Sequence, residues 1–147
     1  MNVVVLDASV ILRWAFEDEP DREGALRVAE ALSAREVRVV GPPNFHMEVA
    51  AALVVAIRSG RMDQVQAAAI LDLLGSVIIL ELQPHAHAVA VFRLAMETGL
   101  RVPDAAYLEA ARREAATLIS ADKAQLAAAG RLGMLAVDVA TVPAWTP

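Results

Sequence analysis

The chain has 147 residues, of which 57% are hydrophobic and 21% are charged, with a formal net charge of −5 and no cysteine. This length predicts one domain with a single large core, and the negative charge argues against broad, non-specific nucleic-acid binding through a basic face. The lack of cysteine excludes disulfides and thiolate metal sites. No apolar run reaches the roughly 18 residues of a membrane span, and the first residues lack the basic region of a signal peptide, so we expect a cytoplasmic protein.

Short apolar runs alternate with helical patterns along the chain. Residues 3–6 form an unbroken apolar run, which is typical of a strand buried on both faces. Further strands are predicted at 37–40, 77–80, 117–120 and 133–137, and helices at 8–16, around 26–32, at 44–59, 63–75 and 84–98, from 103 onward, and at 122–129. This alternation predicts an α/β fold with a mainly parallel sheet and helices on both sides, in a domain of residues 1–140 followed by a tail at 141–147.

Three aspartates are expected at one edge of this sheet. Asp7 follows the first strand and Asp122 follows the strand at 117–120, so both lie at carboxyl ends, where open parallel sheets bind ligands. Asp104 falls in the first turn of the helix that Pro103 begins. Each residue also has a simple structural explanation, because Asp is a common N-cap and a favourable first-turn charge.

A fourth acid, Glu48, lies in the helix predicted at 44–59, which is apolar on almost every face. Charges are rarely buried without a partner or a metal, so the alternatives are an ion pair with Arg58 or Arg61, or a functional role. Four carboxylates that converge without counterions repel one another and raise at least one pKa. A divalent cation with oxygen ligands, Mg²⁺ or Mn²⁺, would remove this conflict.

The four acids lie in short motifs that occur in a fixed order along nearly the whole chain. The motifs are Val-Val-Leu-Asp7-Ala-Ser9, Pro43-Asn-Phe-His-Met-Glu48, Val-Pro-Asp104-Ala-Ala-Tyr107 and Ile-Ser120-Ala-Asp122. In their order and separation they resemble the motifs of PIN-domain ribonucleases, and specifically of VapC-type toxins from toxin–antitoxin pairs.

The resemblance implies a three-layer α/β/α sandwich with a short, mainly parallel sheet and metal-dependent endonucleolytic cleavage of RNA. By the family pattern, the residues that bind Mg²⁺ or Mn²⁺ and activate water are Asp7, Glu48, Asp104 and Asp122. Ser9 and Ser120 would orient these ligands from behind. Two alternatives are a non-catalytic binding module of the same fold, in which the acids only cap helices, and a housekeeping PIN nuclease outside any toxin–antitoxin pair.

The helices at 44–59 and 63–75 carry more apolar surface than one sheet face can cover. We expect this surplus to form a homodimer interface or a groove for an antitoxin segment, two partners that the resemblance also implies. Arg13 and Lys123 lie within a turn of proposed ligands, where either could meet phosphate or pair with a site acid.

The remaining charged residues have less specific expectations. His85 and His87 follow Pro84 at a helix start, and we expect both in a solvated first turn. Glu109, Arg112 and Arg113 are expected on the solvated face of the helix that begins near residue 103.

Overall fold

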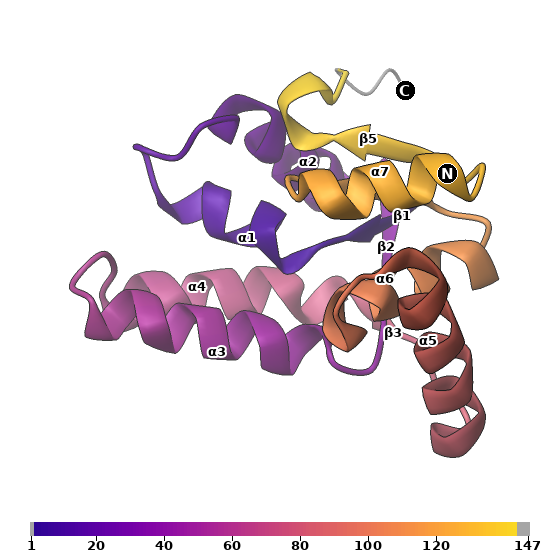
Figure 1. Ribbon diagram of the computed structural model, residues 1–147. Helices are drawn as coiled ribbons and strands as arrows, with labels where there is room; N and C mark the ends of the chain where they lie inside the picture. The colour runs from indigo at the N-terminus through magenta and orange to yellow at the C-terminus, as the bar shows by residue number, and fades with distance from the viewer. Residues whose placement is uncertain (1, 144–147) are drawn as a thin grey trace.

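The computed structural model describes residues 2–143, which form a five-stranded sheet with helices on both faces (Figure 1). The predicted α/β class is therefore confirmed. The strands are β1 (Asn2–Leu6), β2 (Val37–Gly41), β3 (Ile78–Ile79), β4 (Thr117–Ser120) and β5 (Ala136–Asp138). The helices are α1 (Ala8–Ala15), α2 (Arg22–Ser33), α3 (Phe45–Arg58), α4 (Gln64–Leu73), α5 (Pro84–Thr98), α6 (Val102–Arg113) and α7 (Lys123–Arg131), with 3₁₀ turns η1 (Leu74–Ser76) and η2 (Val139–Thr141).

All neighbouring strands in the sheet are parallel, in the order β3-β2-β1-β4-β5. The central strand β1 pairs with β2 through Val4 and Val39, and with β4 through Val4 and Thr117. Val4, Val5 and Leu6 are fully buried, as expected for an apolar run covered on both faces. Since every strand runs the same way, all carboxyl ends meet at one edge.

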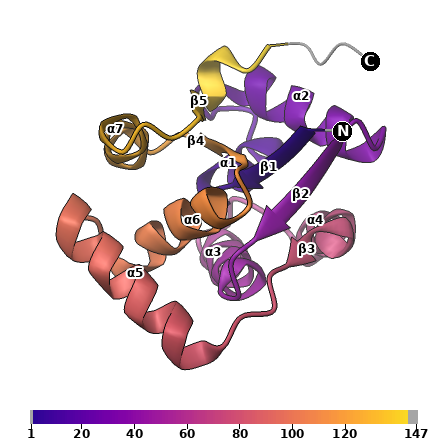
Figure 2. The ribbon, with the colours of Figure 1, turned by 90° about the vertical axis from the view of Figure 1, so that its right-hand side faces the viewer.

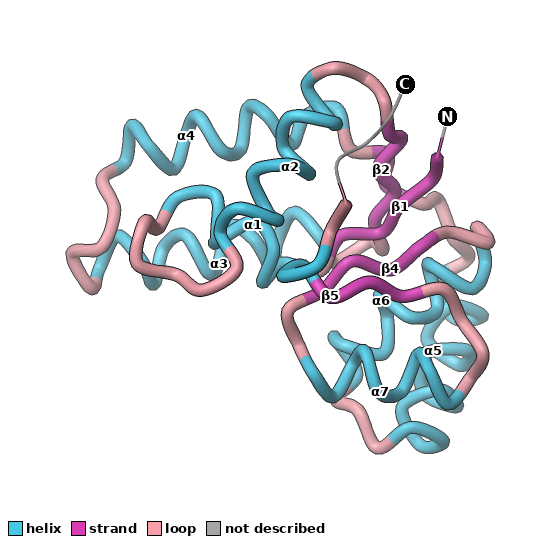
Figure 3. Tube along the Cα trace, turned by 90° about the horizontal axis from the view of Figure 1, so that it is seen from above, coloured by secondary structure: helices cyan, strands magenta, loops and turns pink. Residues whose placement is uncertain are grey.

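The order of the strands reverses at β1, so the connections β1–β2 and β2–β3 cover one face of the sheet, and the connections β3–β4 and β4–β5 cover the other. Figure 3 shows the strands between α1 to α4 on one side and α5, α6 and α7 on the other. In Figure 2, α6 lies beside α5, and the contacts between these two helices are extensive. The three-layer sandwich predicted from the sequence is confirmed.

Helix α6 is the most deeply buried helix of the fold. Its eight consecutive residues from Asp104 to Ala111 are all buried, and it packs on β1, β2 and β4 as well as on α5 and α7. Small alanine side chains allow this close packing on every side. The expectation that Glu109 lies on a solvated face is wrong, because α5 and α7 leave that face of α6 little access to water: Glu109 is only 3% exposed.

The chain beyond β5 packs back on the fold as far as the structure describes it. Val139 and Val142 are buried, and Arg27 donates to the Val142 carbonyl oxygen at 2.7 Å. The predicted tail at 141–147 thus begins with residues that are docked, and its last four residues lie outside the described part. No helix within residues 2–143 combines the length and the apolar character that crossing a membrane requires.

Candidate metal centre

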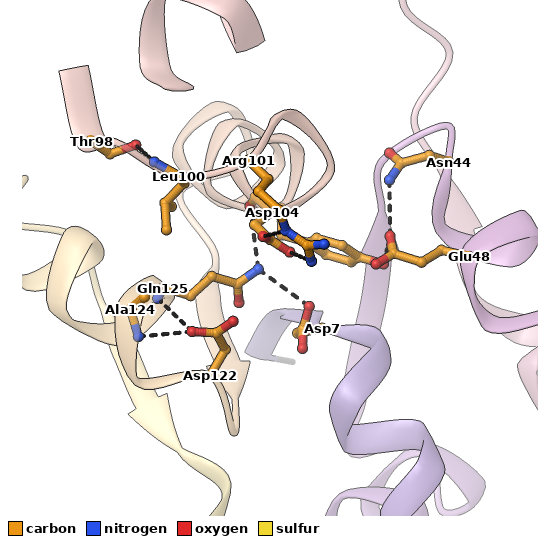
Figure 4. A network of polar contacts seen from close by, with 11 residues as sticks. Asp7, Asn44, Glu48, Thr98, Leu100, Arg101, Asp104, Asp122, Ala124 and Gln125 are labelled. Atoms are coloured by element: carbon orange, nitrogen blue, oxygen red, sulfur yellow. Dashed lines mark hydrogen bonds and ion pairs between the residues drawn. The ribbon is translucent and has the colours of Figure 1, made fainter. Parts of the chain in front are cut away.

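The four acids named from the sequence line one cavity at the carboxyl edge of the sheet. Its volume is about 400 Å³. Figure 4 shows the four carboxylates turned toward one another from separate elements. The charged and hydroxyl-bearing residues that line the cavity are Asp7, Ser9, Arg13, Glu48, Arg101, Asp104 and Asp122.

Asp7 is buried at the junction of β1 and α1, where it acts as the N-cap of α1. Its Oδ2 accepts from the backbone N–H of Ser9 at 3.0 Å, and its Oδ1 accepts from Nε2 of Gln125 at 3.2 Å. Burial raises the pKa of Asp7, and the nearby charge of Asp104 adds to this rise, although the bonds from Ser9 and Gln125 oppose it. The capping role does not exclude a site role, because Asp7 also lines the cavity.

Glu48 lies half-buried in the first turn of α3. Its Oε2 accepts from the hydroxyl of Tyr107 at 2.9 Å and from Nδ2 of Asn44 at 3.1 Å. Burial raises the pKa of Glu48, and the charges of Asp7 and Asp104 raise it further, while the bond from Tyr107 lowers it. Glu48 is thus held by two neutral donors, Tyr107 and Asn44, and not by the arginine that the sequence had suggested.

The ion pair considered for Glu48 is not formed in the described part of the chain. Arg61 instead pairs with Asp18 at 3.2 Å and Glu19 at 3.1 Å, and its guanidinium lies 3.9 Å from the ring centroid of Phe16. Glu48 therefore points to the site without a cationic partner of its own.

Asp104 has the cationic partner that Glu48 lacks. Nε of Arg101 lies 3.0 Å from Oδ2 of Asp104, and a guanidinium NH₂ lies 3.5 Å from Oδ1. The Asp104 side chain is 12% exposed, whereas that of Arg101 is 81% exposed. The arginine thus covers the acid from the solvent side.

Asp122 is the N-cap of α7, and its Oδ1 accepts from the backbone N–H groups of Ala124 and Gln125 at 2.8 and 3.1 Å. The two serines expected behind the acids bond to the backbone of the same loop. Ser120 Oγ accepts from the N–H of Asp122 at 2.9 Å, and Ser9 Oγ accepts from the N–H of Ala121 at 3.3 Å. Both serines fix the loop that carries Asp122.

Four residues of the site were missed by sequence reasoning: Asn44, Arg101, Tyr107 and Gln125. Each lies three or four positions from one of the acids. On a helix this spacing places side chains on the same face, so the helical period could have paired Asn44 with Glu48 and Arg101 with Asp104. Tyr107 and Gln125 instead bond to Glu48 and Asp7, which are 59 and 118 positions away, and no local signal predicts these bonds. Gln125 is the most telling, because its buried amide donates both to Asp7 and, at 3.3 Å, to the carbonyl oxygen of Asp104.

The donor set fits a hard divalent cation. All four acids offer oxygen ligands, and burial, with a smaller contribution from the neighbouring acids, raises the pKa of Asp7 and of Glu48. As the side chains stand, no three His, Asp or Glu residues within 2–143 are grouped closely enough to hold an ion. Arg101 donates to both oxygens of Asp104, at 3.0 and 3.5 Å, so its guanidinium competes with a cation for this carboxylate.

The two other cations near the site, Arg13 and Lys123, bond to groups other than the four acids. Arg13 donates to the carbonyl oxygens of Ser9 at 2.9 Å and Pro20 at 3.1 Å. Lys123 pairs with Asp138 of β5, not with a site acid. The ion pair considered for Lys123, with a site acid, is therefore not formed.

A separate cluster lies between α5 and α6. Arg113 binds the buried Glu109 at 2.7 Å, and Nδ1 of His87 lies 3.6 Å from the other oxygen of this carboxylate. The side chain of His87 is only 15% exposed. The expectation of a solvated His87 and a solvated Glu109 is wrong, because α5 packs against α6 at this point, whereas Arg112 and Arg113 are exposed as expected.

Comparison with known proteins agrees with the fold. A family model described as the PIN domain matches residues 4–131. The structure of PAE2754 from Pyrobaculum aerophilum is 26% identical, with a TM-score of 0.70 over 96% of this chain and 92% of that one.

Two more distant structures share the fold. FitAcB from Neisseria gonorrhoeae is 15% identical, with a TM-score of 0.58 over 92% of this chain and 97% of that one. VapBC2 from Rickettsia felis, bound to a DNA fragment from its promoter, is 17% identical, with a TM-score of 0.57 over 92% of this chain and 98% of that one. No curated protein sequence matches the chain. Since the family model spans most of the sequence, this chain belongs to the PIN-domain family.

Proposed function

We propose that this chain is a Mg²⁺- or Mn²⁺-dependent endoribonuclease that acts as the toxin of a toxin–antitoxin pair in the cytoplasm. PIN domains are generally nucleases. The observation that carries the proposal is the convergence of four carboxylates, from four separate elements, on one cavity at the carboxyl edge of the sheet. The ligands proposed for the cation are Asp7, Glu48, Asp104 and Asp122.

A bound Mg²⁺ or Mn²⁺ supplies Lewis-acid polarisation of a phosphoryl oxygen and lowers the pKa of water, which favours hydrolysis of a phosphodiester. The chain contributes the geometry. Gln125 and the Ser9 N–H orient the two oxygens of Asp7, and Tyr107 and Asn44 orient Glu48. The α7 N-terminus fixes one oxygen of Asp122. Asp7, Glu48 and Asp122 are therefore held by donors that orient their carboxylates at the cavity.

The toxin–antitoxin role draws on the likeness to FitAcB and VapBC2, and on apolar side chains left exposed. The large ones on α3, α4 and α5 are Met47, Val54, Val55, Val65, Leu71, Phe92 and Met96. Exposed apolar patches of this kind mark interaction sites. We propose that they serve a homodimer contact and the docking of an antitoxin segment.

The decisive experiment is cleavage of a panel of structured RNAs by the metal-free protein with and without added Mn²⁺ or Mg²⁺. Asp7→Asn and Asp104→Asn are compared with Asp72→Asn, an exposed acid of α4. Asn retains N-capping ability, so the Asp7 variant is expected to fold. We expect metal-dependent cleavage in wild type and Asp72→Asn, and a loss of at least about 100-fold in the two site variants.

Two other outcomes would change the conclusion. If folded wild type binds neither metal in a calorimetric titration and cleaves no RNA after removal of any co-purified protein, the acids only cap helices, and the non-catalytic binding module is correct. If cleavage requires metal but the chain neither dimerises nor co-purifies with a small partner, the housekeeping nuclease is favoured over the toxin.

A further inference from the structure

Arg101 stands at the mouth of the acid-lined cavity, just before the first turn of α6. Its side chain is 81% exposed, although its guanidinium meets both oxygens of the largely buried Asp104. The exposed guanidinium itself loses little free energy when it leaves this pair, because water solvates it. The buried carboxylate of Asp104, by contrast, needs another cation in its place, and a metal ion would supply it.

Two cations within residues 2–143 line this cavity, Arg13 and Arg101, and of these Arg101 bonds to one of the four acids. Arg13 is fixed by two backbone carbonyl oxygens, and Lys123, just outside, is paired with Asp138. The Arg101 guanidinium instead bonds to both oxygens of Asp104. Arg101 is thus the cation most strongly coupled to the acids themselves.

We propose that Arg101 exchanges partners: it neutralises Asp104 in the metal-free protein and contacts a phosphate oxygen of the RNA backbone once Asp104 ligates the cation. The proposal rests on the proposed function. A planar guanidinium with several N–H donors suits both partners, because carboxylate and phosphate accept the same two-pronged hydrogen bonding. The exchange also explains how a protein of net charge −5 can attract RNA to an acidic cavity.

The test compares Arg101→Gln and Arg101→Lys with Arg112→Gln. Arg112 is an exposed arginine on the same helix that lines a different hollow, so it controls for the loss of one surface charge. Two quantities are measured: Mn²⁺ affinity by calorimetry without RNA, and kcat and KM for RNA cleavage between 50 and 200 mM salt (roughly the range over which backbone contacts respond).

We expect Arg101→Gln to bind Mn²⁺ about two- to fivefold more tightly than wild type, because the competing guanidinium is gone. Its KM for RNA should rise about tenfold, with a smaller change in kcat. The slope of log KM against log salt should fall by about 0.7, the value for one single-strand phosphate contact. Arg101→Lys should restore the salt slope, and Arg112→Gln should behave as wild type.

Two results would overturn the proposal. Unchanged Mn²⁺ affinity in Arg101→Gln shows that the guanidinium does not compete for Asp104. A KM and salt slope equal to those of Arg112→Gln show that it does not contact phosphate. If wild type cleaves no RNA, the proposed function fails and the phosphate contact fails with it, while the Mn²⁺ titration still decides the pairing with Asp104.

Discussion

The bond between Tyr107 and Glu48 joins α6 to α3 across the site and gives a sharp test of the geometry. The Tyr107 hydroxyl donates to Oε2 of Glu48 at 2.9 Å, and the tyrosine is fully buried. Tyr107→Phe removes only this hydroxyl. The ring keeps its edge-on packing against Phe45, with 6.4 Å between centroids.

A hydrogen bond to a charged group contributes about 1.5–3 kcal/mol. Because Glu48 is half-buried, water can replace the lost hydroxyl, so we expect Tyr107→Phe to lower the free energy of unfolding by about 1.5 kcal/mol. For a chain of this length that corresponds to a fall in Tm of roughly 5 °C. In a Glu48→Ala background the hydroxyl has lost its acceptor, so the same change should be neutral or stabilising.

The assay is urea unfolding of the metal-free wild type, both single variants and the double variant, at several pH values. Burial raises the pKa of Glu48 above its ordinary value of 4.5, so ionisation of this group costs stability. The free energy of unfolding therefore falls as the pH rises from about 4.5 through the raised value. Tyr107→Phe should deepen this fall, because the lost bond had lowered the pKa. An equal effect of Tyr107→Phe with and without Glu48, that is a coupling energy below about 0.5 kcal/mol, would refute the reasoning.

Two further predictions concern the rest of the fold. A Cβ on Gly24 of α2 would lie 1.7 Å from the carbonyl oxygen of Val139, so Gly24→Ala should lower the free energy of unfolding by at least about 3 kcal/mol. Gly130→Ala in α7, where nothing lies within 4 Å, is the matched control and should raise it by about 0.5–1 kcal/mol, as the shift in urea midpoint will show. Lys123 lowers the pKa of Asp138 below its ordinary 3.8, so the pair adds stability above that pH, and this is lost as the pH falls through the lowered value. Asp138→Asn should therefore be less stable than wild type at pH 7 and equally stable near pH 2. Thermal unfolding of both proteins at the two pH values measures this, and an equal difference in Tm at both would contradict it.

Much of the fold and part of the site followed from the sequence. The unbroken apolar run of β1 and the alternation of strands with helices predicted a parallel sheet, and a parallel sheet brings all carboxyl ends together. The bonds that Asp7 and Asp122 make as N-caps are also local. They join residues two or three positions apart, so short-range geometry fixes them without knowledge of the fold.

Only the tertiary structure decided which partners hold the acids. Tyr107 lies 59 positions from Glu48, and Gln125 lies 118 positions from Asp7, so these bonds depend on how α3, α6 and α7 pack. The same holds for Glu109, whose helical pattern suggested solvent until α5 brought His87 against it. Sequence pattern determines which face of an element is apolar, whereas burial and the choice of polar partner depend on distant elements that approach through space.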